Sequence, residues 1–376
     1  MNPVPLLAQI GRKGALPSWA CPVIVRISGF GQMLTTASTV SAVLDIPEVT
    51  VPYGERSSVL GLGTFPLALD GEAHRDARNL IKEVLQSSAD AHREGLDAAE
   101  DVAKQIVGKA AGGRLDVAGD LVEPALMAWV ERWFGLEGLG LTLLRSGRMI
   151  MHATFLNPTR PAASVDPIGL RRAVEWVRQT RPQVAEAVRS SDQGTLAREL
   201  LERTDVKTYD DVAGHLLPLS VGPFGLGSWA LDLAIDDLLD RSWELDGLET
   251  DEDGEAAFEA ALRRHGPLLG VKRENPRVRD LKGTNGRIRV PKGPILAATA
   301  CADRGGATDP FAFSSGIHSC LGRSQMTEVS GRILRVLGAA SPRRIQGPGG
   351  RLTLDPKPSG FRTWPFPGRL EVRLLR

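Results

Sequence analysis

Helical periodicity dominates this chain of 376 residues between residues 71 and 242. Apolar residues recur there at intervals of three and four, the spacing of amphipathic helices. Glycine and proline residues separate the helical segments. The predicted helices cover residues 71–85, 89–111, 121–134, 140–155, 168–190, 194–203 and 209–242. No strands alternate with them, which argues against a doubly wound α/β fold.

Short strands are expected only outside this helical body. Residues 22–53 are rich in Val, Ile and Thr, and they predict a hairpin followed by a small helix near Thr39–Leu44. Residues 278–290 predict a strand, a turn and a second strand, and residues 351–376 predict two more short strands. The predicted fold class is therefore mainly α with small peripheral β-sheets, in a single domain over residues 1–376.

The acidic segment Leu248–Glu255 predicts a solvated loop that leads to a helix over Ala256–His265. In the whole chain, charge is balanced, since Lys and Arg number 46 and Asp and Glu number 45. This balance gives no reason to expect binding to nucleic acid or to a membrane surface.

Three cysteines, at positions 21, 301 and 320, form neither a disulfide framework nor a zinc pattern, and they suit a reducing compartment. No segment approaches the length of about 18 consecutive apolar residues that a transmembrane helix needs. Arg12 and Lys13 follow the apolar N-terminal run, which is the wrong order for a secretory signal. We therefore expect a cytoplasmic protein.

Residues 313–322, Phe-Ser-Ser-Gly-Ile-His-Ser-Cys-Leu-Gly, place one cysteine between glycines just before a predicted helix over Ser324–Leu337. Backbone N–H groups and the positive end of that helix favour the thiolate form of Cys320. Gly316 and Gly322 allow a tight turn and a close approach to a flat ligand. A free cysteine taken alone is more often a small buried apolar residue. The whole pattern, however, indicates a metal ligand or a nucleophile.

This loop resembles the heme-ligand signature of the cytochrome P-450 superfamily. That signature has a phenylalanine, a glycine, a basic residue, the cysteine and a final glycine, and all five match at Phe313, Gly316, His318, Cys320 and Gly322. The resemblance implies a cytochrome P-450-like fold of the bacterial soluble type. It also implies heme b as cofactor, with Cys320 as the ligand of its iron.

Other segments resemble the family in the expected order. His74 and Arg78 are four residues apart and share a helix face, as do the residues of the family's C-helix that hold a heme propionate. Val271-Lys-Arg273 resembles the strand after the K-helix, which implies that Arg273 is a second propionate partner and His318 a third. The implied cofactor-binding residues are His74, Arg78, Arg273, Phe313, Gly316, His318, Cys320 and Gly322.

The chain departs from the family in the helix that activates oxygen. That helix normally carries a small residue, a glycine, any residue, an acid and a threonine. With Gly222 as the glycine, Phe224 stands in place of the acid and Gly225 in place of the threonine. Neither residue can donate a side-chain proton, which cleavage of the O–O bond requires. The predicted substrate-pocket residues from this segment are Phe224, Gly225, Leu226 and Trp229.

Pro223 removes a backbone donor and clashes with the preceding turn, so we expect the helix to be broken there. If the register differs, Ser220 or Ser228 is the alternative proton donor.

The K-helix also departs from the family, which has a Glu-x-x-Arg ion pair there. Arg263 occupies the arginine position, but Ala260 occupies that of the glutamate. Glu259 is one residue early, about 100° around the helix, so it cannot simply substitute. Because an unpaired buried arginine is costly, we expect another acid to contact it or the site to be wetter. The connection over residues 300–313 is shorter than in the family, which makes docking of a ferredoxin-type electron donor doubtful.

Three functions are compatible with these features. The first is a heme-thiolate oxidoreductase, similar to a monooxygenase, which acts on a small intermediate of secondary metabolism. In this case substrate, water or peroxide supplies the protons. The second is a P-450-like heme protein that catalyses a rearrangement, a dehydration or a bond formation. The third is a non-catalytic helper of a partner enzyme, which the complete ligand loop argues against. No catalytic residue is assigned.

Overall fold

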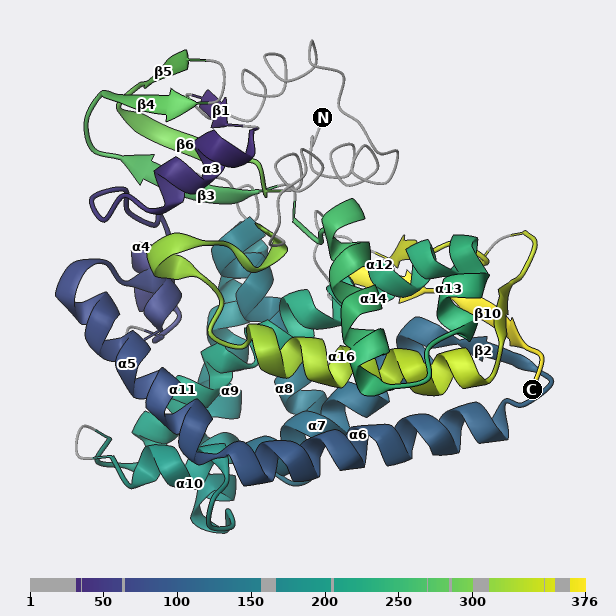
Figure 1. The fold of residues 1–376 in the computed structure, drawn as a ribbon. Helices are drawn as coiled ribbons and strands as arrows, with labels where there is room; N and C mark the ends of the chain where they lie inside the picture. The colour runs from purple at the N-terminus through teal and green to yellow at the C-terminus, as the bar shows by residue number, and fades with distance from the viewer. Residues whose placement is uncertain are drawn as a thin grey trace.

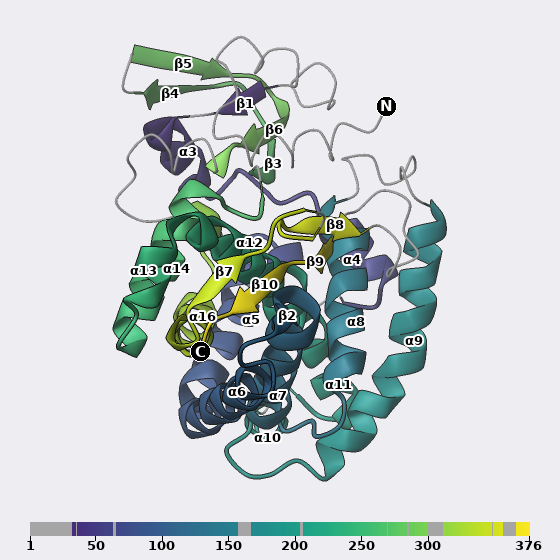
Figure 2. The same ribbon diagram turned by 90° about the vertical axis from the view of Figure 1, so that its right-hand side faces the viewer.

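The computed structural model describes residues 32–34, 36–62, 65–156, 167–203, 206–268, 270–283, 286–299, 311–347, 349–355 and 366–376. A large body of helices carries small sheets at two of its edges (Figures 1 and 2). This arrangement confirms the predicted fold class, mainly α with small peripheral β-sheets. Within the described residues, no helix has both the length and the apolar character needed to cross a lipid bilayer.

The predicted helices are confirmed, with ends that shift by a few residues. The α-helices are α3 (Ala37–Leu44), α4 (Gly54–Val59), α5 (Gly71–Ser87), α6 (Ala89–Lys109), α7 (Glu123–Phe134), α8 (Gly140–Met151), α9 (Pro167–Arg189), α10 (Leu196–Leu201), α11 (Tyr209–Leu219), α12 (Ser228–Leu238), α13 (Ser242–Asp246), α14 (Asp251–Arg264) and α16 (Arg323–Ala339). Among the described residues, three segments have π-helical geometry, namely η2 (Val117–Val122), η3 (His152–Leu156) and η5 (Val221–Gly227). Short 3₁₀ turns are η1 (Pro66–Ala68), η6 (Leu239–Arg241), η7 (Phe311–Phe313) and η8 (Gly316–His318).

The strands in the described part of the chain form four small sheets. They are β1 (Gln32–Leu34), β2 (Arg114–Asp116), β3 (Val271–Asn275), β4 (Arg279–Gly283), β5 (Gly286–Val290), β6 (Gly293–Ala297), β7 (Pro342–Arg344), β8 (Thr353–Asp355), β9 (Phe366–Arg369) and β10 (Glu371–Leu374). The sheet orders are β1-β6-β3, β2-β10-β7, β4-β5 and β8-β9. The predicted strand pair over residues 278–290 is therefore confirmed as β4 and β5. The first part of the predicted hairpin, residues 22–31, lies outside the described residues.

The prediction of a loop over Leu248–Glu255 is wrong for most of its length, because α14 already begins at Asp251. The Thr250 hydroxyl accepts a hydrogen bond from the Asp253 amide at 3.1 Å, and the Asp253 carboxylate accepts one from the Thr250 amide at 3.0 Å. This reciprocal capping box starts the helix. The acidic side chains that suggest a solvated loop are also favourable in the first turn of a helix, where they face its positive end.

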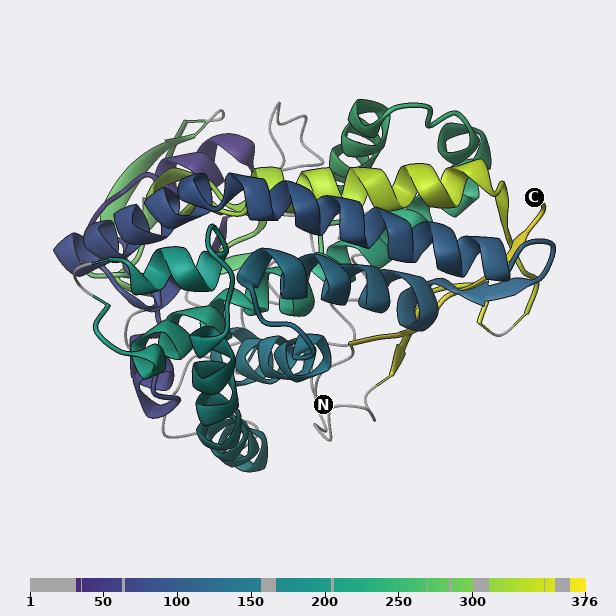
Figure 3. The ribbon, with the colours of Figure 1, turned by 90° about the horizontal axis from the view of Figure 1, so that it is seen from below.

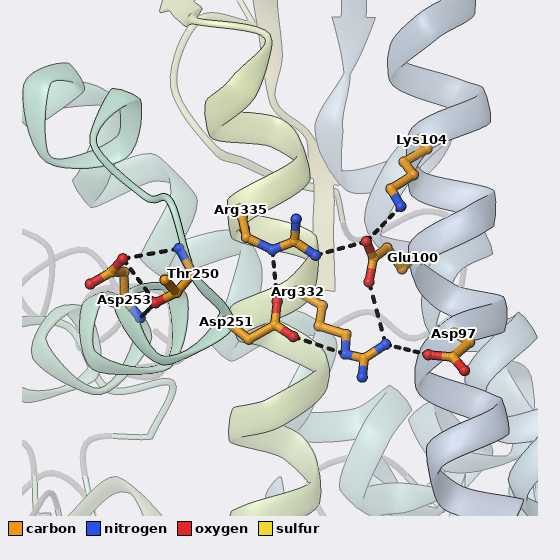
Figure 4. A network of polar contacts seen from close by, with 8 residues as sticks. All are labelled: Asp97, Glu100, Lys104, Thr250, Asp251, Asp253, Arg332 and Arg335. Carbon is orange, nitrogen blue, oxygen red and sulfur yellow. Dashed lines mark hydrogen bonds and ion pairs between the residues drawn. The ribbon is translucent and has the colours of Figure 1, made fainter.

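Helices α6, α14 and α16 are joined by a network of ion pairs (Figure 4). Arg335 of α16 donates to Asp251 of α14 and to Glu100 of α6, both at 2.7 Å. Arg332, one turn earlier, contacts Asp251 at 3.3 Å and Glu100 at 3.3 Å. Figure 3 shows α16 and α6 lying side by side along much of their length. The network therefore fixes the far end of the helix that follows the cysteine loop.

Candidate functional site

The cysteine loop joins the two short turns η7 and η8 to the start of α16. Its ends are closed by the backbone amide of Cys320, which donates to the Phe313 carbonyl at 2.8 Å. Gly316 has a φ of +67°, and a Cβ at this position would lie 2.3 Å from the Leu44 carbonyl oxygen. Only glycine fits there. An added Cβ at Gly322 would meet no atom within 4 Å, so the backbone faces open space at that point.

Cys320 is an exposed residue. Surrounding protein nevertheless raises the pKa of its thiol by desolvation, while the Gly322 amide, Arg78 and Arg323 act in the opposite direction. Cys320 is therefore not a buried residue of the hydrophobic core. It remains accessible to a ligand.

Four basic side chains from three elements gather beside this loop. His74 and Arg78 come from α5, Arg273 from β3 and His318 from η8. His74, Arg273 and His318 are each only 3% exposed. The imidazole rings of His74 and His318 lie 4.1 Å apart between centroids. Arg78 donates to the carbonyl and the hydroxyl of Ser319, at 2.7 and 2.9 Å, and so holds the residue next to Cys320.

Burial lowers the pKa of each histidine in this group. The pKa of His74 falls to about 4, first through desolvation and then through the nearby positive charges of His318 and Arg78. Desolvation likewise lowers the pKa of His318, although Asp70 acts against it. The Asp70 carboxylate lies 3.6 Å from His318 Nε2, which is too long for a hydrogen bond. Among the described residues, neither ring nitrogen of His318 has a hydrogen-bond partner.

Arg273 is also buried, and desolvation lowers its pKa. Its guanidinium donates to the carbonyl of Lys272 at 2.9 Å. Within the described residues, Asp70 is the one carboxylate within 4 Å of a side-chain nitrogen of these four basic residues. Because burial disfavours the charged form of both imidazoles, the positive charge of the cluster rests on Arg78 and Arg273. These guanidinium groups and the imidazole N–H groups are hydrogen-bond donors that can bind an anion.

Around Pro223, where a broken helix is expected, the regular α-helix is interrupted by π-helical geometry while the chain stays helical. Helix α11 ends at Leu219, the π-helical segment η5 covers Val221–Gly227, and α12 starts at Ser228. Gly222 is exposed, and a Cβ there would meet no atom within 4 Å.

The four predicted substrate-pocket residues have different surroundings. Phe224 is fully buried, and a Cβ at Gly225 would lie only 2.9 Å from Met151 Cβ of α8. Phe224 and Gly225 therefore belong to the part of η5 that packs against neighbouring helices. Leu226 is half-buried and Trp229 is buried.

The two serines that flank η5 use their hydroxyl protons within the helix. Ser220 donates to the Leu217 carbonyl at 2.5 Å, and Ser228 donates to the Phe224 carbonyl at 3.0 Å. Both residues are buried. In this arrangement neither hydroxyl proton is available to a ligand.

Glu259 has a partner that the sequence pattern does not indicate. Its Oε1 accepts hydrogen bonds from Nη2 and Nε of Arg323, at 2.8 and 3.1 Å. Arg263 is only half-buried, which fits the expectation of a wetter site. Sequence reasoning missed Glu259, Arg323 and Ser319 as residues that hold the loop, because their contacts join segments far apart in the chain.

No protein-family model matches the chain, and no curated protein matches its sequence. Its structure is nevertheless similar to solved structures over nearly its whole length. P450BioI in complex with hexadec-9Z-enoic acid ligated acyl carrier protein gives a TM-score of 0.74 at 16% identity, covering 97% of this chain and 99% of that one. CalO2 gives 0.74 at 17% identity, covering 98% and 97%. Cytochrome P450 CYP109Q5 from Chondromyces apiculatus gives 0.70 at 17% identity, covering 99% and 95%. The chain therefore has the cytochrome P450 fold.

Proposed function

We propose that this protein is a heme-thiolate oxidoreductase in which Cys320 is the protein ligand of the iron of heme b. One observation carries the proposal: an accessible thiol lies beside a cluster of buried basic side chains. Heme has complementary chemistry, since it combines an iron that accepts a thiolate with two carboxylates that need cationic partners.

The residues present fit this cofactor. The ring nitrogens of His318 lack hydrogen-bond partners among the described residues, and an N–H of a neutral imidazole can donate to a carboxylate. Arg78 and Arg273 remain charged at neutral pH and can form charge-assisted hydrogen bonds with carboxylates. The described residues contain no group of three or more His, Cys, Asp or Glu side chains that could hold a metal ion by themselves. A single thiolate suits a metal that brings its other ligands with it, as heme iron does.

When bound, the heme supplies an iron centre that exchanges electrons and acts as a Lewis acid, with the thiolate pushing electron density toward it. The protein's own contribution is to hold and orient this group. Arg78 secures the residue beside Cys320 through Ser319, and the buried basic side chains provide the anion-binding end.

The residues of η5 supply no side-chain proton at the positions where the family carries an acid and a threonine. Phe224 and Gly225 have no donor, and the hydroxyls of Ser220 and Ser228 donate to backbone carbonyls. We infer that substrate, water or peroxide provides the protons. The substrate is a small biosynthetic intermediate of secondary metabolism.

The lack of a proton donor in η5 also favours a second candidate function, a reaction without net oxidation such as rearrangement, dehydration or bond formation. A ferredoxin-type electron donor is needed only for the oxidative function with oxygen. Docking of this donor is doubtful because the connection over residues 300–313 is short. Residues 300–310 of that connection lie outside the described residues.

Absorption spectra of the purified protein test the proposal. We expect heme in the ferric protein and a thiolate-type Soret band in the ferrous protein under carbon monoxide. Turnover that requires peroxide or a reductase supports the oxidative function, whereas turnover without reductant or oxygen supports the second candidate. A protein that lacks heme and co-purifies with a partner enzyme contradicts both and points to a helper.

A further inference from the structure

Helix α14 contacts both ends of the cysteine loop through two adjacent residues. The ring of Phe258 lies 6.5 Å from that of Phe313, where the loop begins. Glu259 accepts two hydrogen bonds from Arg323, where the loop ends and α16 starts. The guanidinium carbon of Arg323 also lies 5.7 Å from the centroid of the Phe313 ring. One ion pair and a set of aromatic contacts therefore connect the loop to α14.

Helices α14 and α16 run antiparallel and contact each other at several points along their length. Arg335 pairs with Asp251 near the far end of α16 (Figure 4). Midway, a Cβ at Gly254 would lie 2.2 Å from the Gly331 carbonyl, so the backbones touch. The Glu259–Arg323 pair closes the end next to the cysteine. Helix α14 thus supports α16 from its far end to the loop.

The Glu259–Arg323 pair lies on the helix that lacks the usual K-helix glutamate. Ala260 replaces that glutamate. The carboxylate of Glu259 points in another direction around the helix and contacts Arg323, three residues after Cys320. Both side chains of the pair are partly shielded, with 36% of Arg323 and 24% of Glu259 exposed. Two charge-assisted hydrogen bonds to one oxygen at a partly buried site are stronger than a typical surface ion pair.

We propose that Glu259 and Arg323 are positioning residues that hold the cysteine loop on α14 and thereby keep Cys320 in the geometry for binding iron. The importance of this pair for catalysis rests on the proposed function. The role of the pair in holding the loop does not, because the Glu259–Arg323 contact joins two protein side chains directly.

The Cys320 amide offers a direct measure of the loop, since it donates to the Phe313 carbonyl. We expect Glu259→Gln to speed hydrogen exchange at this amide about three- to ten-fold in the heme-free protein, because losing the ion pair makes local opening easier. In the heme-loaded protein, the same change should lower the fraction of the ferrous carbon monoxide complex with a thiolate-type band. The double variant Glu259→Gln with Arg323→Gln should show no larger loss of the thiolate-type band than Arg323→Gln alone, since the two residues act as one unit.

Asp246→Asn is the matched control. It breaks the pair of Asp246 with Arg343, which joins α13 to β7 and has comparable exposure, 38% for Arg343 and 29% for Asp246. This control should leave both the Cys320 amide and the spectrum unchanged. The proposal is overturned if the Cys320 amide of Glu259→Gln exchanges at the wild-type rate, or if Asp246→Asn has an equal effect on that rate. It is also overturned if the losses of the thiolate-type band in the two single variants add up in the double variant. A wild-type protein without the thiolate-type band contradicts the heme assignment instead, and the exchange measurement still decides the role of the pair.

Discussion

The cysteine loop and the segment η5 are built from different kinds of contact. Charged and polar groups hold the loop: Arg78 bonds to Ser319, and Arg323 bonds to Glu259. In η5 the side chains are apolar or absent, and the flanking serines donate to carbonyls of their own helix. Under the proposed function, the difference between the two segments shows that this fold can retain the residues that hold the heme and yet lose the side chains that donate protons.

The largest effect is expected at Arg273. Arg273→Met removes a buried positive charge, which we expect to stabilise the heme-free protein by about 1 kcal/mol or more, because that charge is costly without an anion. The same change should weaken heme binding by about 2–4 kcal/mol, or about 30- to 1000-fold, through the loss of a buried charged partner. Heme titration and thermal unfolding of the heme-free protein measure the two effects. The exposed Arg289 provides the control as Arg289→Met, and unchanged heme affinity in Arg273→Met contradicts the assignment.

Two glycines of η5 should respond oppositely to alanine. Gly225→Ala places a methyl group 2.9 Å from Met151 Cβ and 3.2 Å from the Gly147 carbonyl. We expect a loss of about 1–3 kcal/mol in the free energy of unfolding. Gly222→Ala meets no atom within 4 Å, and it should stabilise the protein by about 0.5–1 kcal/mol. Denaturant unfolding of the two variants compares them directly. Equal stabilities would show that Gly225 does not pack closely against α8.

A smaller effect concerns pH and His74. The pKa of His74 is lowered to about 4 in the folded protein, against about 6.5 in the unfolded chain. As pH falls through this window, the unfolded chain binds a proton that the folded chain does not, so stability decreases with falling pH. We expect His74→Gln to reduce this loss in the heme-free protein by an amount on the order of 1 kcal/mol.

Unfolding curves at several pH values measure the change. The pKa of His92 is also lowered to about 4 by burial, but His92 is present in both proteins and cancels in the comparison. Bound heme carboxylates should raise the pKa of His74, so the heme-loaded wild type should lose less stability on acidification. Identical pH dependence in wild type and His74→Gln would contradict the burial of a neutral imidazole there.

Local patterns account for what could be predicted from the sequence. The cysteine loop is a run of ten residues with fixed spacing, and helix periodicity is equally local. The break at Pro223 follows from the missing backbone donor and the ring clash of one residue. The early start of α14 also had a local signal, since Thr250 and Asp253 have the spacing of a capping box. In that segment, however, the acidic composition favours the interpretation of a solvated loop.

Contacts between distant segments account for what could not be predicted. Glu259 and Arg323 are 64 residues apart, and no spacing rule pairs them. The surroundings of Phe224 and Gly225 depend on how η5 packs against α8, which helical periodicity does not specify. The strand β7 contains only Pro342–Arg344 and forms by pairing with β10 near the end of the chain. Such short strands depend on their partners more than on their own sequence.

The most direct test of the central claim compares Cys320→Ala with the wild type in absorption spectra of the ferrous protein under carbon monoxide. The wild type should show a thiolate-type Soret band, and the variant should lose it completely, even if the basic residues around His74 and Arg273 still retain some heme. A thiolate-type band that persists in Cys320→Ala, or one that the wild type never shows, would contradict the assignment of Cys320 as the iron ligand.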